Sequence, residues 1–158
     1  MIRFFFPLFF LLLLSAPAWA LSGRVVGVAD GDTITVLTSD KQRIKIRLYG
    51  IDCPEKKQAY GDRARDFTGA AVFGRDVQVE SLGRDRYGRT LGIVTGPDGR
   101  ILNRELLVNG LAWVYARYCK RPECVRWHDD EAEARSARRG LWRHKNPLPP
   151  WEWRKAKH

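Results

Sequence analysis

Four carboxylates stand out in a chain that is otherwise strongly basic. Asp30 and Asp32 flank a glycine, and Asp52 and Glu55 lie close together further along. Asp and Gly are common turn formers, so either pair alone indicates only a turn. If both turns lie at one end of a small antiparallel meander, the four carboxylates come close in space. They then repel one another unless a cation binds between them.

Such a cluster is an incomplete ligand shell for a hard divalent cation, which waters and a substrate phosphate can complete. Two arginines, Arg47 and Arg89, carry guanidinium groups that match phosphate oxygens and stabilise charge on a phosphoryl transition state. Glu55, placed beside the cation, can orient or deprotonate a water molecule. These residue types together predict the hydrolysis of a phosphodiester.

Short strands must position these residues. β-branched side chains predict strands on either side of the Asp30–Asp32 turn, over residues 25–28 and 33–38. Ile44, Ile46 and Leu48 then alternate with basic residues that include Arg47. This period of two places the aliphatic set on the core and Arg47 on the opposite face. Two further strands are predicted over residues 77–82 and 90–94.

Helices are predicted between and after the strands. Apolar residues recur at helical spacing from Tyr60 to Ala71 and predict a first helix there. A shorter helix is predicted over 103–109. Acidic residues from Asp129, followed by basic residues up to Arg139, indicate a last helix, because this order of charge suits the helix dipole. The predicted fold is α+β and mainly β, a five-stranded barrel of the oligonucleotide-binding (OB) type that carries helices.

The N-terminus resembles an export signal. Arg3 precedes the apolar run 4–14, and Ala18-Trp19-Ala20 forms a cleavage site. A membrane anchor is the alternative, but the run is short for a span and Pro7 interrupts it. We therefore expect residues 1–20 to be a cleavable signal peptide of a periplasmic or secreted protein, without stable membrane insertion afterwards. The domain covers 21–142, and 143–158 is expected to be an irregular basic tail rich in Pro and Trp.

Three cysteines must be interpreted with export in mind, because disulfides persist outside the cytosol. Cys119 and Cys124 are close enough in sequence to form a disulfide across one loop. The alternative is a zinc site that also uses His128, but a structural zinc site needs a fourth ligand. Cys53 is left unpaired.

The charge predicts a polyanionic partner. The chain carries 28 Lys and Arg against 18 Asp and Glu, a net charge of +10. Nucleic acid is the first candidate and an anionic membrane surface the second. With 44% hydrophobic and 29% charged residues, the chain fits neither a disordered protein nor a polytopic membrane protein. Charge alone does not separate binding from cleavage.

Three motifs, in order, resemble the staphylococcal nuclease (thermonuclease) family. They are Asp30-Gly31-Asp32-Thr33, the run from Arg47 to Glu55, and Asp85-Arg86-Tyr87-Gly88-Arg89. Later stretches around 103–112 and 140–142 also agree, so the resemblance covers about residues 22–142. It implies an OB barrel with three helices. It also implies a monomeric calcium-dependent endonuclease that acts on single- and double-stranded DNA and RNA and leaves 3′-phosphates.

The resemblance also implies roles for individual residues. Asp32 and Asp52 would bind calcium through their carboxylates, and Cys53 would do so through its backbone carbonyl. Asp30 would support these ligands without binding the ion.

The remaining roles concern the substrate. Glu55 would be the general base, while Arg47 and Arg89 would bind the phosphate and stabilise the transition state. Tyr87 would contact a nucleotide, and the second tyrosine of the family corresponds to Tyr115 or Tyr118.

The chain departs from the family pattern in two places. Cys53 stands where the first enzyme of the family has Thr, which a main-chain ligand tolerates. The segment after Glu55 is shorter, with four residues before Tyr60. The alternative function is a barrel that binds nucleic acid without cutting it. Relatives of that kind typically lose acidic or arginine members of the site, and this chain keeps them.

Overall fold

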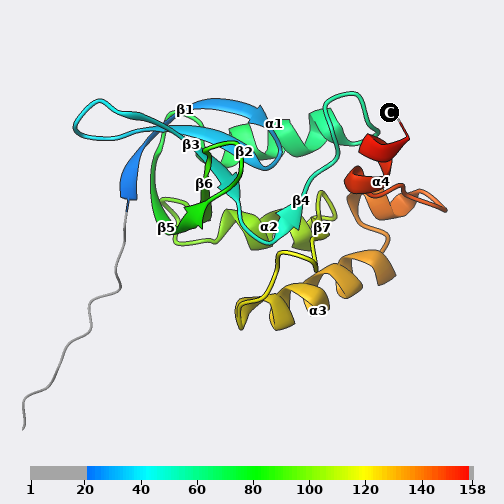
Figure 1. Cartoon of the computed structure of the whole chain (residues 1–158). Helices are drawn as coiled ribbons and strands as arrows, with labels where there is room; N and C mark the ends of the chain where they lie inside the picture. The colour runs from blue at the N-terminus through cyan, green and yellow to red at the C-terminus, as the bar shows by residue number, and fades with distance from the viewer. Residues whose placement is uncertain (1–20, 157–158) are drawn as a thin grey trace, which may run out of the picture.

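Five strands close a barrel in the computed structural model, which describes residues 21–156. Their spatial order is β1-β2-β3-β6-β5 (Figure 1). The strands are β1 (Leu21–Asp30), β2 (Thr33–Leu37), β3 (Arg43–Leu48), β5 (Asp76–Arg84) and β6 (Thr90–Thr95). A separate small sheet pairs β4 (Ile51–Asp52) with β7 (Trp113–Val114). The predicted α+β class, with a five-stranded OB barrel, is confirmed.

The alternation predicted for β3 sets the inside and outside of the barrel. Ile46 and Leu48 are buried, whereas Arg43 and Lys45 are exposed. Ile34 on β2 pairs directly with Ile46 and is also fully buried. Antiparallel pairing thus stacks aliphatic residues of neighbouring strands on the same face, which forms the core.

Three helices flank the barrel: α1 (Gly61–Val72), α2 (Leu102–Val108) and α3 (Glu123–Ser136). α3 begins before the predicted start at Asp129 because its buried face begins earlier, at Cys124 and Trp127. Cys124 forms a disulfide with Cys119, with the two Cα atoms 5.7 Å apart. The disulfide is therefore confirmed, and the zinc alternative is wrong because both thiols are consumed.

The C-terminal segment differs from the irregular tail that the sequence predicts. A 3-10 turn, η1 (Gly140–Arg143), leads to a short helix, α4 (Pro150–Lys155). Pro150 occupies the first turn of α4, where its missing N–H costs no helical hydrogen bond. Trp151 stacks on Tyr115, with ring centroids 5.1 Å apart and planes at 5°. Tertiary packing orders a segment whose sequence shows no helical period.

The predicted signal peptide, residues 1–20, lies outside the described residues. In the part of the chain that the structure describes, no helix has the length and apolar character needed to cross a membrane.

A buried carboxylate, Asp130, joins α2 to α3. Its side chain is 4% exposed, and Arg104 of α2 donates two hydrogen bonds to it, at 2.7 and 3.0 Å. Arg126, one turn earlier on α3, adds a third at 3.3 Å. Although burial acts to raise the pKa of Asp130, the arginine bonds outweigh it and lower that pKa. The folded state therefore favours the ionised form.

We expect Asp130→Asn to lower the free energy of unfolding at pH 7 by about 1–3 kcal/mol, because it removes the charge that Arg104 and Arg126 share. The stabilisation is present above the ordinary Asp pKa of 3.8 and is lost as the pH falls through the lowered pKa of the folded state. Urea unfolding at several pH values measures this. If the difference in free energy of unfolding between wild type and Asp130→Asn persists unchanged below pH 3, the stabilisation does not come from the Asp130 charge.

Candidate active site

The turn between β1 and β2 presents Asp32 from a closely packed backbone. A Cβ atom added at Gly31 would lie 2.7 Å from the Ala64 Cβ and 2.8 Å from the Cys53 Sγ. Only glycine therefore lets the turn pack this closely on α1 and on the segment after β4. Asp30 Oδ1 accepts the backbone N–H of Asp32 at 3.1 Å, which fixes the turn, and Asp32 is 5% exposed.

The second turn meets the first through backbone hydrogen bonds. The Leu48 N–H donates to the Asp32 carbonyl at 2.8 Å, and the Cys53 N–H donates to Asp32 Oδ2 at 2.6 Å. Asp52 pairs with Trp113 in the β4–β7 sheet and is 1% exposed. The structure thus brings together Asp32, Asp52 and Cys53, which the sequence places in two separate turns.

Arg47 lies between the two aspartates. Its Nη1 is 3.1 Å from Asp32 Oδ2, and its Nη2 donates to Asp52 Oδ1 at 2.8 Å. Arg47 faces away from the aliphatic core, as its strand position predicts, yet its side chain is only 12% exposed. Burial acts to lower the pKa of Arg47, but the charges of Asp32 and Asp52 raise it, so the guanidinium remains charged.

Burial disfavours the ionised forms of two carboxylates at the site, Asp30 and Asp52. Burial, followed by the neighbouring charge of Asp32, raises the pKa of Asp30 to about 7. The pKa of Asp52 is also raised, chiefly by burial and against the bonds from Arg154 and Arg47. Both shifts indicate carboxylates that a further cation would stabilise.

The donors present fit a hard divalent cation. Asp32 and Asp52 lie within reach of a single guanidinium and offer anionic oxygens, the ligands that Ca²⁺ and Mg²⁺ prefer. Among residues 21–156, no group of three or more His, Cys, Asp and Glu side chains could hold a metal ion. A site here would therefore use two carboxylates together with main-chain oxygens and water.

Glu55 lies in the loop between β4 and α1, next to the aspartates. Its side chain is 38% exposed, and its Oε1 accepts a hydrogen bond from Arg154 Nη1 at 2.6 Å. Arg154 Nη2 also donates to Asp52 Oδ2 at 2.8 Å. The sequence analysis missed Arg154, which follows Glu55 by 99 positions. Its only sequence signal is a basic residue beside two tryptophans, which does not indicate where the segment folds.

Arg89 stands at the edge of the site rather than among the carboxylates. Asp85 accepts its Nε–H at 2.7 Å, and its Nη1 lies 3.5 Å from the hydroxyl of Thr33, which in turn donates to Asp32 at 3.2 Å. Burial acts to raise the pKa of Asp85, but the bonds from Arg89 lower it. A firmly ionised Asp85 therefore holds this guanidinium in place.

Three aromatic side chains are available near the site. Tyr87 is 69% exposed, and the guanidinium groups of Arg86 and Arg89 lie 4.8 and 5.5 Å from its ring centroid. Tyr118 is 53% exposed, whereas one face of Tyr115 is covered by Trp151. An exposed ring with cationic neighbours suits stacking of a nucleobase beside its phosphate.

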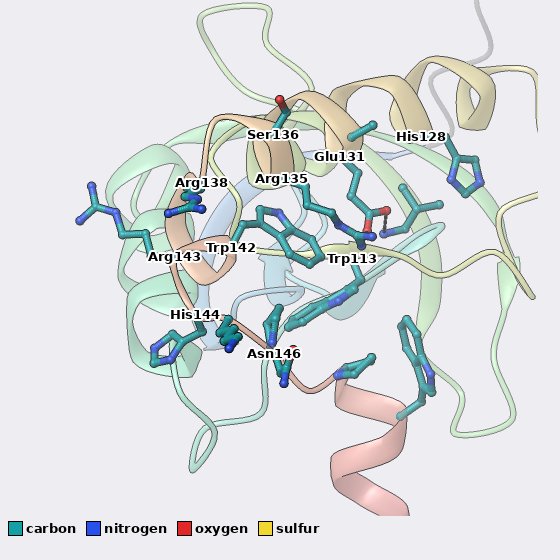
Figure 2. Close-up of a pocket in the computed structure, with 16 residues that line it drawn as sticks. Trp113, His128, Glu131, Arg135, Ser136, Arg138, Trp142, Arg143, His144 and Asn146 are labelled. Carbon is teal, nitrogen blue, oxygen red and sulfur yellow. Dashed lines mark hydrogen bonds and ion pairs between the residues drawn. The ribbon is translucent and has the colours of Figure 1, made fainter.

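A separate groove of about 1340 Å³ lies between α3 and the C-terminal segment, and none of the candidate carboxylates lines it. Figure 2 shows Trp113, Trp142 and Arg135 in this groove. The two indole rings meet edge to face with centroids 5.3 Å apart, and the Arg135 guanidinium carbon lies 4.2 Å from the Trp142 ring centroid. Trp151, on the segment that carries Arg154, forms part of its wall.

A closed OB barrel with buried carboxylates beside arginines is the arrangement of a phosphodiester hydrolase. Comparison with known proteins agrees. Residues 45–144 match the model of the staphylococcal nuclease homologue family. The chain is 44% identical over 155 residues to Protein ParB of Escherichia coli, which covers 91% of this chain and 85% of that protein.

Two further relatives carry nuclease names. The micrococcal nuclease of Shigella flexneri is 44% identical over 154 residues, covering 92% of this chain and 87% of that protein. An uncharacterized endonuclease of Escherichia coli is 47% identical over 135 residues, covering 85% of this chain and 86% of that protein. The chain belongs to the staphylococcal nuclease family and is a nuclease of the hydrolase class.

The Cys53 thiol is buried and should be chemically silent in the folded protein. Burial, aided by the charge of Asp32, raises its pKa well above the ordinary value, so little reactive thiolate forms. We expect the native protein to react negligibly with a thiol reagent such as DTNB. After denaturation without reductant, one thiol per chain should react, because Cys119 and Cys124 are bonded to each other. Three reactive thiols would contradict the disulfide.

Proposed function

We propose that the protein is a calcium-dependent endonuclease that hydrolyses the phosphodiester bonds of DNA and RNA, single- or double-stranded, and leaves 3′-phosphate ends. It would act as an exported monomer, in the periplasm or outside the cell. The observation that carries this proposal is the convergence of Asp32 and Asp52 on one arginine, with Glu55 joined to Asp52 through Arg154. The disulfide supports an oxidising compartment.

The metal ligands would be Asp32 and Asp52 through their carboxylates and Cys53 through its backbone carbonyl, with Asp30 fixing the turn behind Asp32. When bound, calcium would neutralise these carboxylates and stabilise negative charge on the phosphate. Support comes from the raised pKa values of Asp30 and Asp52, because burial disfavours their ionised forms and a bound cation would stabilise those forms.

Glu55 would act as the general base. It takes a proton from a water molecule, the resulting hydroxide attacks phosphorus, and the bond from phosphorus to the 5′-oxygen breaks. The phosphate then stays on the 3′-oxygen, and the 5′-oxygen leaves as a hydroxyl after it takes up a proton from solvent. Among residues 21–156, only Arg154 bonds to the Glu55 carboxylate, and it uses Oε1, so Oε2 remains for the water.

Arg47 and Arg89 would bind the phosphate oxygens. Arg47 donates from Nη1 and Nη2 to carboxylates and carbonyls, and within the described chain its Nε–H has no partner. Arg89 approaches the site from the β5–β6 turn, where Tyr87 would stack on a base. Two guanidinium groups, one from strand β3 and one from the β5–β6 turn, suit a phosphate with charge spread over several oxygens.

The second candidate is a barrel that binds nucleic acid without cleaving it, which the +10 charge and exposed Tyr87 would also suit. It does not account for buried Asp32 and Asp52, because carboxylates repel phosphate unless a cation lies between them. We therefore favour the enzyme.

Purified protein lacking residues 1–20 should cleave end-labelled single-stranded DNA in calcium and should stop when a chelator is added. The products should carry 3′-phosphates, so that a DNA polymerase extends them only after phosphatase treatment. Restoring excess calcium should restore cleavage, which separates metal loss from denaturation. Nucleic-acid binding without cleavage in calcium, magnesium and manganese would favour the binding module instead.

Glu55→Gln should lower kcat by about 10²- to 10⁴-fold, because an amide cannot accept the proton of the water. The affinity for DNA should change little, since Glu55 does not bind the phosphate. Steady-state kinetics together with fluorescence anisotropy in calcium measure the two quantities.

Glu133→Gln is the matched control, because Glu133 is exposed on α3 and, within residues 21–156, forms an ion pair only with Arg139. It should behave as wild type. If Glu55→Gln also keeps the wild-type kcat, Glu55 is not the base.

A further inference from the structure

Arg154 joins the C-terminal helix to the candidate active site. Its guanidinium bridges two carboxylates: Nη1 donates to Glu55 Oε1 at 2.6 Å and Nη2 to Asp52 Oδ2 at 2.8 Å. A longer contact of 3.4 Å runs from Nη1 to Asp52 Oδ1. Bonds of this kind are charge-assisted, and two on one planar group fix the relative position of both acceptors.

The segment that carries Arg154 is anchored to the domain at two points, at Gln58 in the Glu55 loop and at Tyr115. Gln58 Nε2 donates to the Leu148 carbonyl at 2.5 Å, while Gln58 Oε1 accepts the Glu55 N–H at 3.0 Å. Trp151 stacks on Tyr115, which follows β7. Figure 1 shows α4 beside the loop that joins β4 to α1. The segment therefore supports the backbone of Glu55 through Gln58 and its side chain through Arg154.

Glu55 needs such support because its own loop gives its side chain little. The side chain is 38% exposed, and a long exposed carboxylate samples several rotamers. The loop itself is tight: a Cβ atom added at Gly61 would lie 2.0 Å from the Glu55 carbonyl oxygen. The backbone is thus fixed while the carboxylate, apart from Arg154, is not.

We infer that Arg154 is a positioning residue of the hydrolytic reaction, and that the C-terminal helix is part of the active site. Its bond to Oε1 holds the Glu55 carboxylate in one orientation and leaves Oε2 to take the proton of the attacking water. Its second bond aligns Asp52, and a carboxylate oxygen that accepts one such bond keeps a lone pair for a cation. This inference rests on the proposed function.

The alternative role for Arg154 is inhibitory. Its guanidinium would then occupy the position of the metal ion and would have to leave before catalysis. The anchors of the segment favour positioning, because Gln58 and Trp151 hold it on the domain independently of Arg154. The two roles predict opposite changes in calcium affinity and turnover when the guanidinium is removed.

The test compares Arg154→Ala and Arg154→Lys with Lys155→Ala, an exposed neighbour on the same helix. We expect Arg154→Ala to lower kcat on single-stranded DNA by about 10- to 100-fold with a KM within about threefold of wild type. Arg154→Lys should recover only part of the loss, because an ammonium cannot bridge two carboxylates as a planar fork does. Lys155→Ala should match wild type.

Two further measurements separate positioning from a general structural role. A low, non-denaturing concentration of guanidinium should raise the rate of Arg154→Ala and leave Lys155→Ala unchanged, while thermal unfolding shows both variants folded. Calcium affinity by titration calorimetry should be unchanged or weaker in Arg154→Ala.

Each other outcome overturns the inference. Tighter calcium binding with faster turnover in Arg154→Ala would make Arg154 a competitor of the metal. A wild-type kcat, or a loss that guanidinium does not restore at all, would also reject positioning. An inactive wild type in calcium would instead reject the proposed function.

Discussion

The site depends on keeping two buried aspartates side by side, an arrangement that costs several kcal/mol unless positive charge offsets it. Arg47 provides that charge within the barrel wall, because the β2–β3 register places it opposite Thr33, next to Asp32. The backbone N–H of Cys53 then closes the gap between the two turns by binding Asp32 Oδ2. The bonds of Arg47 to both aspartates and the bond of the Cys53 N–H to Asp32 therefore hold the two carboxylates close together.

The functional unit extends past the domain boundary that the sequence and the family match both suggest. The match to the family ends at residue 144, whereas α4 spans Pro150–Lys155 and carries Arg154 to Glu55. Trp151 supplies the apolar contact that keeps the helix there, by stacking on Tyr115. A basic stretch with a high content of Pro and Trp is in this case an ordered wall of the site.

Features of the fold that depend on neighbouring residues in the sequence could be predicted from that sequence. The period of two in β3 gave the core face, with Ile46 and Leu48 buried, and the acidic turns gave the carboxylates. Charge alone predicts that α3 starts at Asp129, whereas the burial of Cys124 and Trp127 extends the helix back to Glu123. Arg154 could not be found, since its role arises from a contact across 99 positions that no periodicity encodes.

Arg154 is separated along the sequence from every other residue of the candidate site. The barrel residues, both aspartates, Glu55 and Arg89 are all synthesised well before Arg154. The five barrel strands contain none of the residues that anchor α4, so the barrel and the guanidinium partner of Glu55 come from separate parts of the chain. Full hydrolytic competence therefore requires the C-terminal helix to be docked beside the Glu55 loop, and closure of the barrel alone does not provide it.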